Sequence, residues 1–131
     1  LLDAAKYDFV VDAIDSLSPK VFLIALSKRR GLPVISSMGA GAKRDASLIE
    51  VADIARSYNC TLARAVRKRL RKLGISRGVP VVFSSELPDE SSVMEIEGER
   101  CKRSTAGTIS YMPAIFSCRI AAYVIEKLTE Q

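Results

Sequence analysis

Apolar and polar positions change period along the chain, and each change marks a predicted element. A short, largely β-branched apolar run at 9–14 predicts a buried strand, and Leu32–Ser36 predicts a second one. Between them, apolar residues recur with helical spacing from Pro19, and Gly31 supplies a stop signal. Ser18 is expected to cap this helix, with Pro19 at its first position. Strand, helix and strand within about 30 residues predict a βαβ unit with parallel strands.

The second half of the chain continues the pattern. Strands are predicted at 48–54 and 79–84, and helices at 62–73 and 111–131. The first of these helices should be capped by Thr61 and ended by Gly74. The segment 87–105 is polar and charged, which predicts an exposed loop or a short hairpin. The last helix is apolar on several sides, so we expect it to be mostly buried against the sheet or a partner subunit. These elements predict an α/β fold.

Composition and the first residues narrow the class. Hydrophobic residues make up 48% of the chain, which excludes a disordered protein, and no apolar run reaches the length of a membrane span. No signal sequence is present either, so we expect a soluble, intracellular protein. Leu1–Ala5 resembles the end of a helix and begins without Met, so we expect a piece of a longer protein. The net charge is +5, and there is no histidine, so any chemistry must use carboxylates, Lys, Arg, Ser, Tyr or Cys.

The three cysteines are far apart in the sequence and include no CxxC pair. This spacing argues against both a disulfide framework and a zinc site. Each is a possible nucleophile or sulfur carrier, although free thiols are the simpler interpretation. We expect Cys118 to pack in the core of the last helix. Cys60 and Cys101 lie beside basic residues, which would lower the pKa of a thiol. Because there is no histidine to act as a base, this is weak evidence for a reactive thiol.

Asp15 is the leading candidate for chemistry. It follows the first predicted strand and precedes a helix, and open α/β sheets bind ligands at the carboxyl ends of their strands. A carboxylate there can hold a divalent cation against nucleotide phosphates. A solvated loop aspartate or a secondary helix cap explains the spacing equally well. Asp12 lies within the strand, where we expect a structural hydrogen-bonding role.

Two further segments admit both a functional and a plain interpretation. Gly39–Gly41 follows the second strand, where small residues let a ligand come close to the backbone, but GAGA lacks both GxGxxG and a Walker lysine and also fits a tight loop. The predicted helix at 62–73 carries six cations within nine residues and no acid. Such a run is either a solvated face or a surface for phosphate backbones. Its candidate contacts are Arg64, Arg67, Lys68, Arg71 and Lys72.

Four ordered blocks carry a resemblance to a known family. They read FVVDAIDSLSPK, LPVISSMGAGAKRDASLIEVADIARS, VPVVFSSE and GTISYMPAIFSCRIAAYVIEKL. Together they resemble the C-terminal half of the ThiF/MoeB/HesA family, the bacterial relatives of ubiquitin-activating enzymes, and most of all its branch of tRNA threonylcarbamoyladenosine dehydratases. The resemblance implies a Rossmann-like three-layer fold with a mixed sheet and a long C-terminal helix. Residues 1–131 would then be the C-terminal part of one adenylating domain, with the nucleotide-loop half upstream.

The resemblance also implies cofactors, partners and roles. The family adenylates a carboxylate with ATP and Mg²⁺, and the position matching Asp15 is implicated in Mg²⁺ binding and in adenylation. Ser16 and Lys20 match positions near the nucleotide, and the loop holding Gly39 and Gly41 would line the activated carboxylate. A cytoplasmic homodimer acting on tRNA is implied, with peripheral membrane association as a further implication.

Two alternatives to the dehydratase remain open at this stage. One is an adenylyltransferase that activates a carrier protein and works with a sulfur-transfer partner, although the two CxxC pairs of such members are absent here. The other is a non-catalytic remnant that dimerises or binds RNA. Since the phosphate-gripping residues of the family would lie upstream of Leu1, we expect the chain alone not to turn over.

Overall fold

The computed structural model describes residues 6–41, 43–87 and 111–130. The elements, in chain order, are β1 (Val10–Asp12), α1 (Leu17–Arg29), β2 (Val34–Ser37), η1 (Ala46–Leu48), β3 (Ile49–Asp53), η2 (Ile54–Arg56), α2 (Thr61–Lys72), β4 (Pro80–Ser84) and α4 (Tyr111–Thr129). Each predicted strand and helix is therefore present, with shifted ends. The predictions for Leu1–Ala5 and for most of 87–105 lie outside the described residues.

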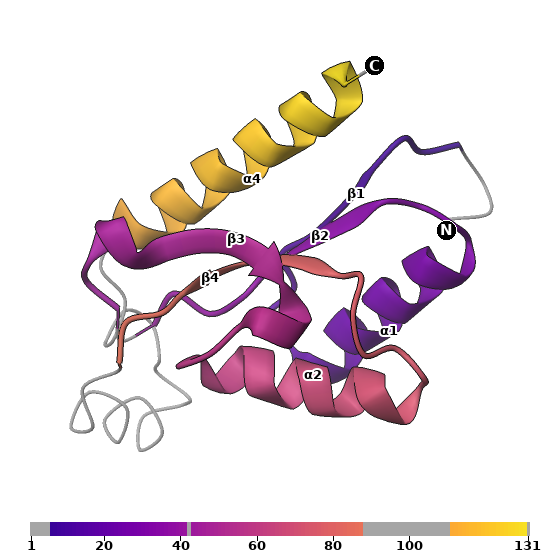
Figure 1. Ribbon diagram of the computed structural model, residues 1–131, viewed down its shortest axis with the longest axis horizontal. Coiled ribbons are helices and arrows are strands. Elements are labelled where there is room, and N and C mark those ends of the chain that lie inside the picture. The colour runs from indigo at the N-terminus through magenta and orange to yellow at the C-terminus, as the bar shows by residue number, and fades with distance from the viewer. Residues whose placement is uncertain (1–5, 42, 88–110, 131) are drawn as a thin grey trace.

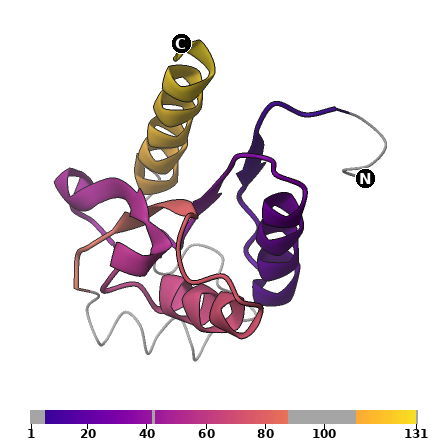
Figure 2. The same ribbon diagram turned by 45° about the vertical axis from the view of Figure 1, so that its right-hand side comes forward.

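The four strands form one mixed sheet in the order β1-β2-β4-β3. β1 pairs in parallel with β2, as the βαβ pattern predicted, and β2 also pairs in parallel with β4. β3 runs antiparallel to β4, with Val51 opposite Val82. α1 and α2 lie on one side of the sheet and α4 lies on the other, which gives the three layers seen in Figures 1 and 2.

Two apolar cores hold these layers together, one on each face of the sheet. Val81 and Phe83 of β4 face the α1–α2 side, while Val82 between them faces α4, because successive side chains of a strand point to opposite faces. The core on the α1–α2 side also contains Ile24 and Leu70. β4 is thus covered on both faces, as a central strand of a three-layer fold requires.

Within this chain, the sheet buries less of α4 than the sequence predicted, and its burial against a partner subunit stays a prediction. Of the described residues of α4, only Met112, Phe116 and Ile120 are buried, and they form one stripe at four-residue spacing. Ile125 and Leu128 are 62% and 54% exposed. Cys118, predicted to be a core residue, is exposed as well because it projects from outside that stripe. No helix within the described residues is long and apolar enough to cross a membrane.

Both predicted helix caps were displaced by one or two residues. Ser16 rather than Ser18 is the N-cap of α1, and its side chain makes no capping hydrogen bond. Cys60 rather than Thr61 caps α2, with its Sγ accepting a hydrogen bond from the Ala63 N–H at 3.4 Å. The predicted stop at Gly31 is confirmed, since this residue adopts φ 69°, a conformation that favours glycine.

Candidate functional site

The carboxyl ends of β1 and β2 meet at one edge of the sheet, because the two strands are parallel. The predicted site residues Asp15 and Ser16 lie in the loop between β1 and α1, and Gly39 and Gly41 follow β2. Both Asp15 and Ser16 are exposed. No donor among the described residues contacts the Asp15 carboxylate, so its oxygens are free to take a ligand. The structure therefore brings the two predicted loops to the same edge.

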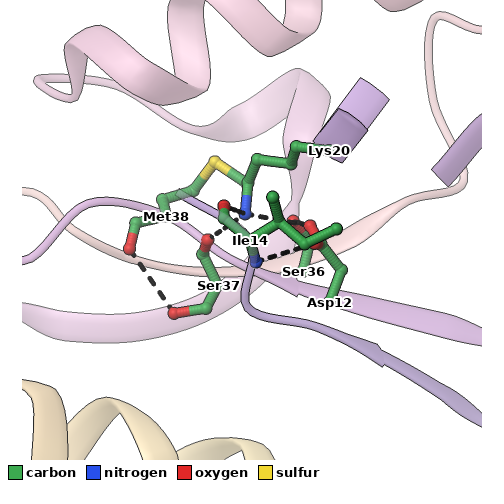
Figure 3. Close-up of polar contacts among 6 residues, drawn as sticks. All are labelled: Asp12, Ile14, Lys20, Ser36, Ser37 and Met38. Atoms are coloured by element: carbon green, nitrogen blue, oxygen red, sulfur yellow. Dashed lines mark hydrogen bonds and ion pairs between the residues drawn. The ribbon is translucent and has the colours of Figure 1, made fainter. Parts of the chain in front are cut away.

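Lys20 ties these two loops together from inside the fold. Its side chain is 0% exposed, and its Nζ donates to Ile14 O at 3.0 Å and to Ser37 O at 2.6 Å (Figure 3). Ile14 belongs to the loop that carries Asp15, whereas Ser37 ends β2 just before the glycine loop. The ammonium group thus fixes the two loops relative to each other.

The charge of Lys20 is balanced by a buried carboxylate. Asp12 Oδ2 lies 2.9 Å from Lys20 Nζ, and both side chains are 0% exposed. Asp12 also accepts hydrogen bonds from Ser36 Oγ at 2.6 Å and from the Ile14 N–H at 3.0 Å, as Figure 3 shows. The structural role predicted for Asp12 is confirmed, and its bond to Ile14 N–H accompanies the early end of β1.

Lys20 itself was predicted to contact the nucleotide, and its position argues against that role. Its Nζ has oxygen partners on three sides, namely Asp12, Ile14 and Ser37, so no donor remains for a phosphate. Lys20 lies behind the candidate site and positions it. The sequence carried a signal for this burial, because Lys20 precedes the buried Ile24 by four residues and so shares its helix face.

The glycine loop packs against the start of α2. A Cβ atom placed on Gly39 would lie 3.9 Å from the Cβ of Leu62, which is an ordinary van der Waals distance. Packing alone therefore leaves room for a methyl group at position 39. The close approach of Gly39 and Gly41 to a ligand stays a prediction.

Lys43 is a second buried lysine, which the sequence interpretation missed. It is 3% exposed, and its Nζ donates to Asn59 O at 2.6 Å, to Ser84 O at 3.4 Å and to Glu86 O. These carbonyls lie before α2, at the end of β4 and just beyond it. The side chain of Glu86 in turn accepts hydrogen bonds from the Arg44 and Asp45 N–H groups at 2.7 Å each. Lys43 thus joins the segment after the glycine loop to two neighbouring segments.

The burial of Lys43 predicts a pH dependence of stability. Loss of water lowers the pKa of Lys43 below its usual 10.5, an effect partly offset by the nearby Cys60 and Glu86. Between the lowered folded pKa and 10.5 the unfolded chain binds more protons at this residue, so its contribution to the free energy of unfolding rises with pH. We expect wild type to gain stability relative to Lys43→Met as the pH rises towards 10.5, measured by urea unfolding across the alkaline range.

The matched control for that experiment is Lys68→Met, at an exposed lysine of α2. Its stability difference from wild type should stay nearly flat over the same pH interval. A Lys43→Met difference as flat as that of the control would show that Lys43 keeps its ordinary pKa in the folded chain.

The cations of α2 divide into an outward set and an inward set. Arg67 is half-buried, and its Nη1 donates to Ser57 O at 3.1 Å and to Ser57 Oγ at 2.8 Å. Arg69 donates to Ser18 Oγ at 3.2 Å. Among the described residues, no carboxylate forms an ion pair with α2. Arg69 is exposed as well, and the other exposed cations of α2, which make no side-chain hydrogen bond with a described residue, are called here the basic face: Arg64, Lys68, Arg71 and Lys72.

The described residues could hold a magnesium ion only together with ligands from a substrate. They contain no group of three or more His, Cys, Asp or Glu side chains able to hold a metal by themselves. Mg²⁺ is often held by one or two carboxylates together with substrate phosphates, and the open Asp15 carboxylate suits that arrangement. Cys60 is buried at the start of α2, with its sulfur turned to the helix backbone.

Comparison with known proteins agrees with this geometry. A model of the ThiF family matches residues 3–131. The chain belongs to the ThiF family. The resemblance carried by the four sequence blocks is therefore confirmed.

Named relatives of this ThiF-family chain point to one branch. The chain is 34% identical over 140 residues to tRNA threonylcarbamoyladenosine dehydratase 2 of Saccharomyces cerevisiae, covering 95% of this chain and 31% of that protein. It is 43% identical over 81 residues to the tRNA threonylcarbamoyladenosine dehydratase of Bacillus subtilis, covering 62% of this chain and 32% of that one. The chain thus spans about a third of the length of these curated relatives.

Solved structures show the same branch. The crystal structure of the Escherichia coli dehydratase TcdA in complex with AMP matches with a TM-score of 0.80 and 28% identity, covering 96% of this chain and 49% of that chain. TcdA in complex with ATP matches with a TM-score of 0.79 and 28% identity, covering 95% and 49%. The Rossmann-like three-layer fold is confirmed, and the chain spans about half of each TcdA chain.

Proposed function

We propose that this chain is the C-terminal part of the adenylating domain of an ATP-dependent tRNA threonylcarbamoyladenosine dehydratase. The observation that carries the proposal is the exposed Asp15 carboxylate, which no described residue contacts, at the carboxyl edge of a ThiF-family sheet. The match to TcdA in complex with AMP and with ATP supports a nucleotide at such a fold. The remaining nucleotide contacts would come from the part of the relatives' length that this chain does not cover.

In this proposal each local feature has one task. Asp15 would hold Mg²⁺, which supplies charge neutralisation at the phosphates of ATP. Ser16 lies beside it at the start of α1, where exposed N–H groups favour anions. The loop with Gly39 and Gly41 would line the substrate carboxylate. Lys20 fixes the positions of these two loops relative to each other, so that Asp15 and the glycine loop would already be ordered when the substrate binds.

The reaction is a ring closure in two steps. The threonylcarbamoyl carboxylate attacks the α-phosphorus of ATP and releases pyrophosphate, which leaves the carboxyl carbon activated as a mixed anhydride with AMP. An internal nitrogen then attacks that carbon, loses its proton and expels AMP. The net change is loss of water from the substrate, coupled to cleavage of ATP to AMP and pyrophosphate.

The direct test uses the full-length protein with ATP, Mg²⁺ and tRNA carrying threonylcarbamoyladenosine. We expect cyclic product, AMP and pyrophosphate in equal amounts, detected by mass spectrometry of the digested tRNA and by nucleotide chromatography. Formation of AMP only when a small carrier protein is added would instead favour the adenylyltransferase alternative. Nothing in the site favours a sulfur relay through Cys60, because this thiol is buried as a helix cap.

A cytoplasmic homodimer is part of the proposal, and so is tRNA binding by the basic face. Removing two of its charges, as Lys68→Gln with Arg71→Gln, should reduce the salt slope of tRNA binding by roughly 1.4 to 1.8, since each lost phosphate contact removes about 0.7 to 0.9. The measurement is the tRNA affinity of the full-length protein at several salt concentrations.

The matched control removes the same charge from the other layer, as Arg119→Gln with Lys127→Gln on α4. Both residues are exposed on the opposite side of the sheet. We expect this control to keep nearly the wild-type slope. If the salt slope of tRNA binding is the same in both double variants, the basic face contacts only solvent and not tRNA.

A further inference from the structure

A cavity of about 340 Å³ opens at the start of α2, next to the basic face. Its lining consists of Ser57, Tyr58, Asn59, Cys60, Thr61, Arg64 and Arg67. The volume falls within the usual range of sites for small organic ligands. The lining contains two guanidinium groups, one aromatic ring and no acid, so it suits an anion with a flat apolar part.

This cavity is called here the Tyr58 cavity. Its aromatic wall is the ring of Tyr58, which packs against the core on one side and is open to solvent on the other. Tyr58 is 53% exposed. Its edge contact with the fully buried Phe83 has a centroid separation of 5.7 Å and an interplanar angle of 68°. A ring supported by the core and exposed to solvent is a ready platform for stacking, because only a small entropic cost remains for ordering it.

The cationic wall of the cavity consists of Arg67, whose guanidinium is held by hydrogen bonds, and Arg64, whose guanidinium is not held by any described residue. Arg67 is held by Ser57 through its Nη1, so its remaining N–H groups are presented from a constrained guanidinium. Arg64 is exposed, and no described residue forms an ion pair or a side-chain hydrogen bond with it. The first turn of α2 is already capped by Cys60, so the side chains, rather than the helix end, would supply the contacts.

Continuity with the basic face identifies the class of ligand. Arg64 belongs to the Tyr58 cavity and also begins the basic face, which continues at Lys68, Arg71 and Lys72 along the helix. A free nucleotide would fill the cavity and leave that row of cations without a partner. A polynucleotide would use both, with its backbone along the row and one base turned into the cavity, which requires an unpaired base.

We propose that the Tyr58 cavity holds one unpaired nucleotide of the RNA substrate, with its base on the Tyr58 ring and an adjacent phosphate on Arg64 and Arg67. This inference rests on the proposed function, since it assumes that the full-length protein acts on RNA. It adds a specific requirement, namely that RNA is recognised partly through a single-stranded segment. The basic face alone would bind paired and unpaired RNA by charge only.

The experiment compares two RNA probes on the full-length protein, a hairpin with an unpaired loop and a duplex with the same number of phosphates. Tyr58→Leu keeps an apolar contact for Phe83 but removes the flat ring, and it should lower hairpin affinity roughly tenfold while leaving duplex affinity unchanged. Tyr58→Phe, the matched control, should bind both probes like wild type. Arg64→Gln should reduce the salt slope for the hairpin by about 0.7.

Wild-type hairpin affinity in Tyr58→Leu overturns the inference. So does a parallel loss of hairpin and ATP affinity in a Tyr58→Leu protein with unchanged melting temperature, because the cavity would then take ATP. If Tyr58→Leu fails to fold, Arg64→Gln decides, and a wild-type salt slope in that exposed variant rejects the site. A protein that shows all the expected binding losses yet never cyclises the modified tRNA would reject the proposed reaction and retain the nucleotide site.

Discussion

Replacing Asp15 by Asn in the full-length protein is expected to lower ATP-dependent cyclisation by roughly a thousandfold, because a metal-held phosphate contributes several kcal/mol to stabilising the transition state. The amide keeps the size of the side chain and one acceptor oxygen but loses the negative charge that we propose binds Mg²⁺. Binding of tRNA should stay near normal, because the basic face lies on another element, α2. The measurements are single-turnover product formation and tRNA affinity on the same protein preparation.

Asp8→Asn is the matched control for Asp15→Asn. Asp8 is also an exposed aspartate, but it precedes β1 and so lies at the opposite end of that strand. Its replacement should leave turnover unchanged. If Asp15 is only a solvated residue beside the start of α1, Asp15→Asn should cost about 0.3 to 1 kcal/mol of stability and nothing in turnover, and that result would remove the assignment.

Replacing Lys20 by Met is expected to destabilise the full-length protein by about 3 to 5 kcal/mol, because Asp12 would be left as a buried charge without its cation. The same change frees the loop of Asp15 from the end of β2, since both carbonyl contacts of Lys20 are lost. We expect a lower melting temperature together with weaker catalysis. Urea unfolding and turnover, each measured below the new melting temperature, separate the two effects.

Two variants make the Lys20 result specific. Asp12→Asn combined with Lys20→Met should recover part of the lost stability, because the double variant buries no charge. Lys127→Met serves as the control for an ion pair, since its contact with Glu130 at 3.4 Å is exposed. It should cost no more than about 1 kcal/mol. A Lys20→Met loss as small as that of Lys127→Met would show that the buried pair contributes little.

The order and type of the described elements could be predicted from the sequence because periodicity and glycine stops report local geometry directly. The carboxyl-edge position of Asp15 followed from the same pattern. The failures concern properties that depend on distant partners. The periodicity of α4 shows apolar residues on several faces, but the sheet covers only the stripe through Phe116, and this selection is a property of the tertiary arrangement.

The two buried lysines show a different limit. Lysine is mostly exposed in proteins, so the sequence pattern predicts that Lys20 and Lys43 contact solvent or a ligand. Their real partners are chiefly main-chain carbonyls on segments far away in sequence, such as Ser37 and Ser84, and a hydrogen-bond acceptor present in every residue leaves no mark in the sequence. The roles of Ser16, Gly39 and Gly41 stay predictions.

Because the two lysines bind main-chain acceptors, the residues that carry these acceptors can change in sequence without loss of the contact. Replacing Ile14 or Ser37 changes a side chain but keeps the carbonyl that Lys20 holds. Asn59, whose carbonyl Lys43 holds, is more constrained, because it adopts φ 57° and its Nδ2 donates to Ser85 O at 2.7 Å. The loops can therefore accumulate substitutions at Ile14 and Ser37 while their anchoring contacts persist. Engineering at this edge of the sheet should accordingly vary Ile14 and Ser37 and leave the two lysines untouched.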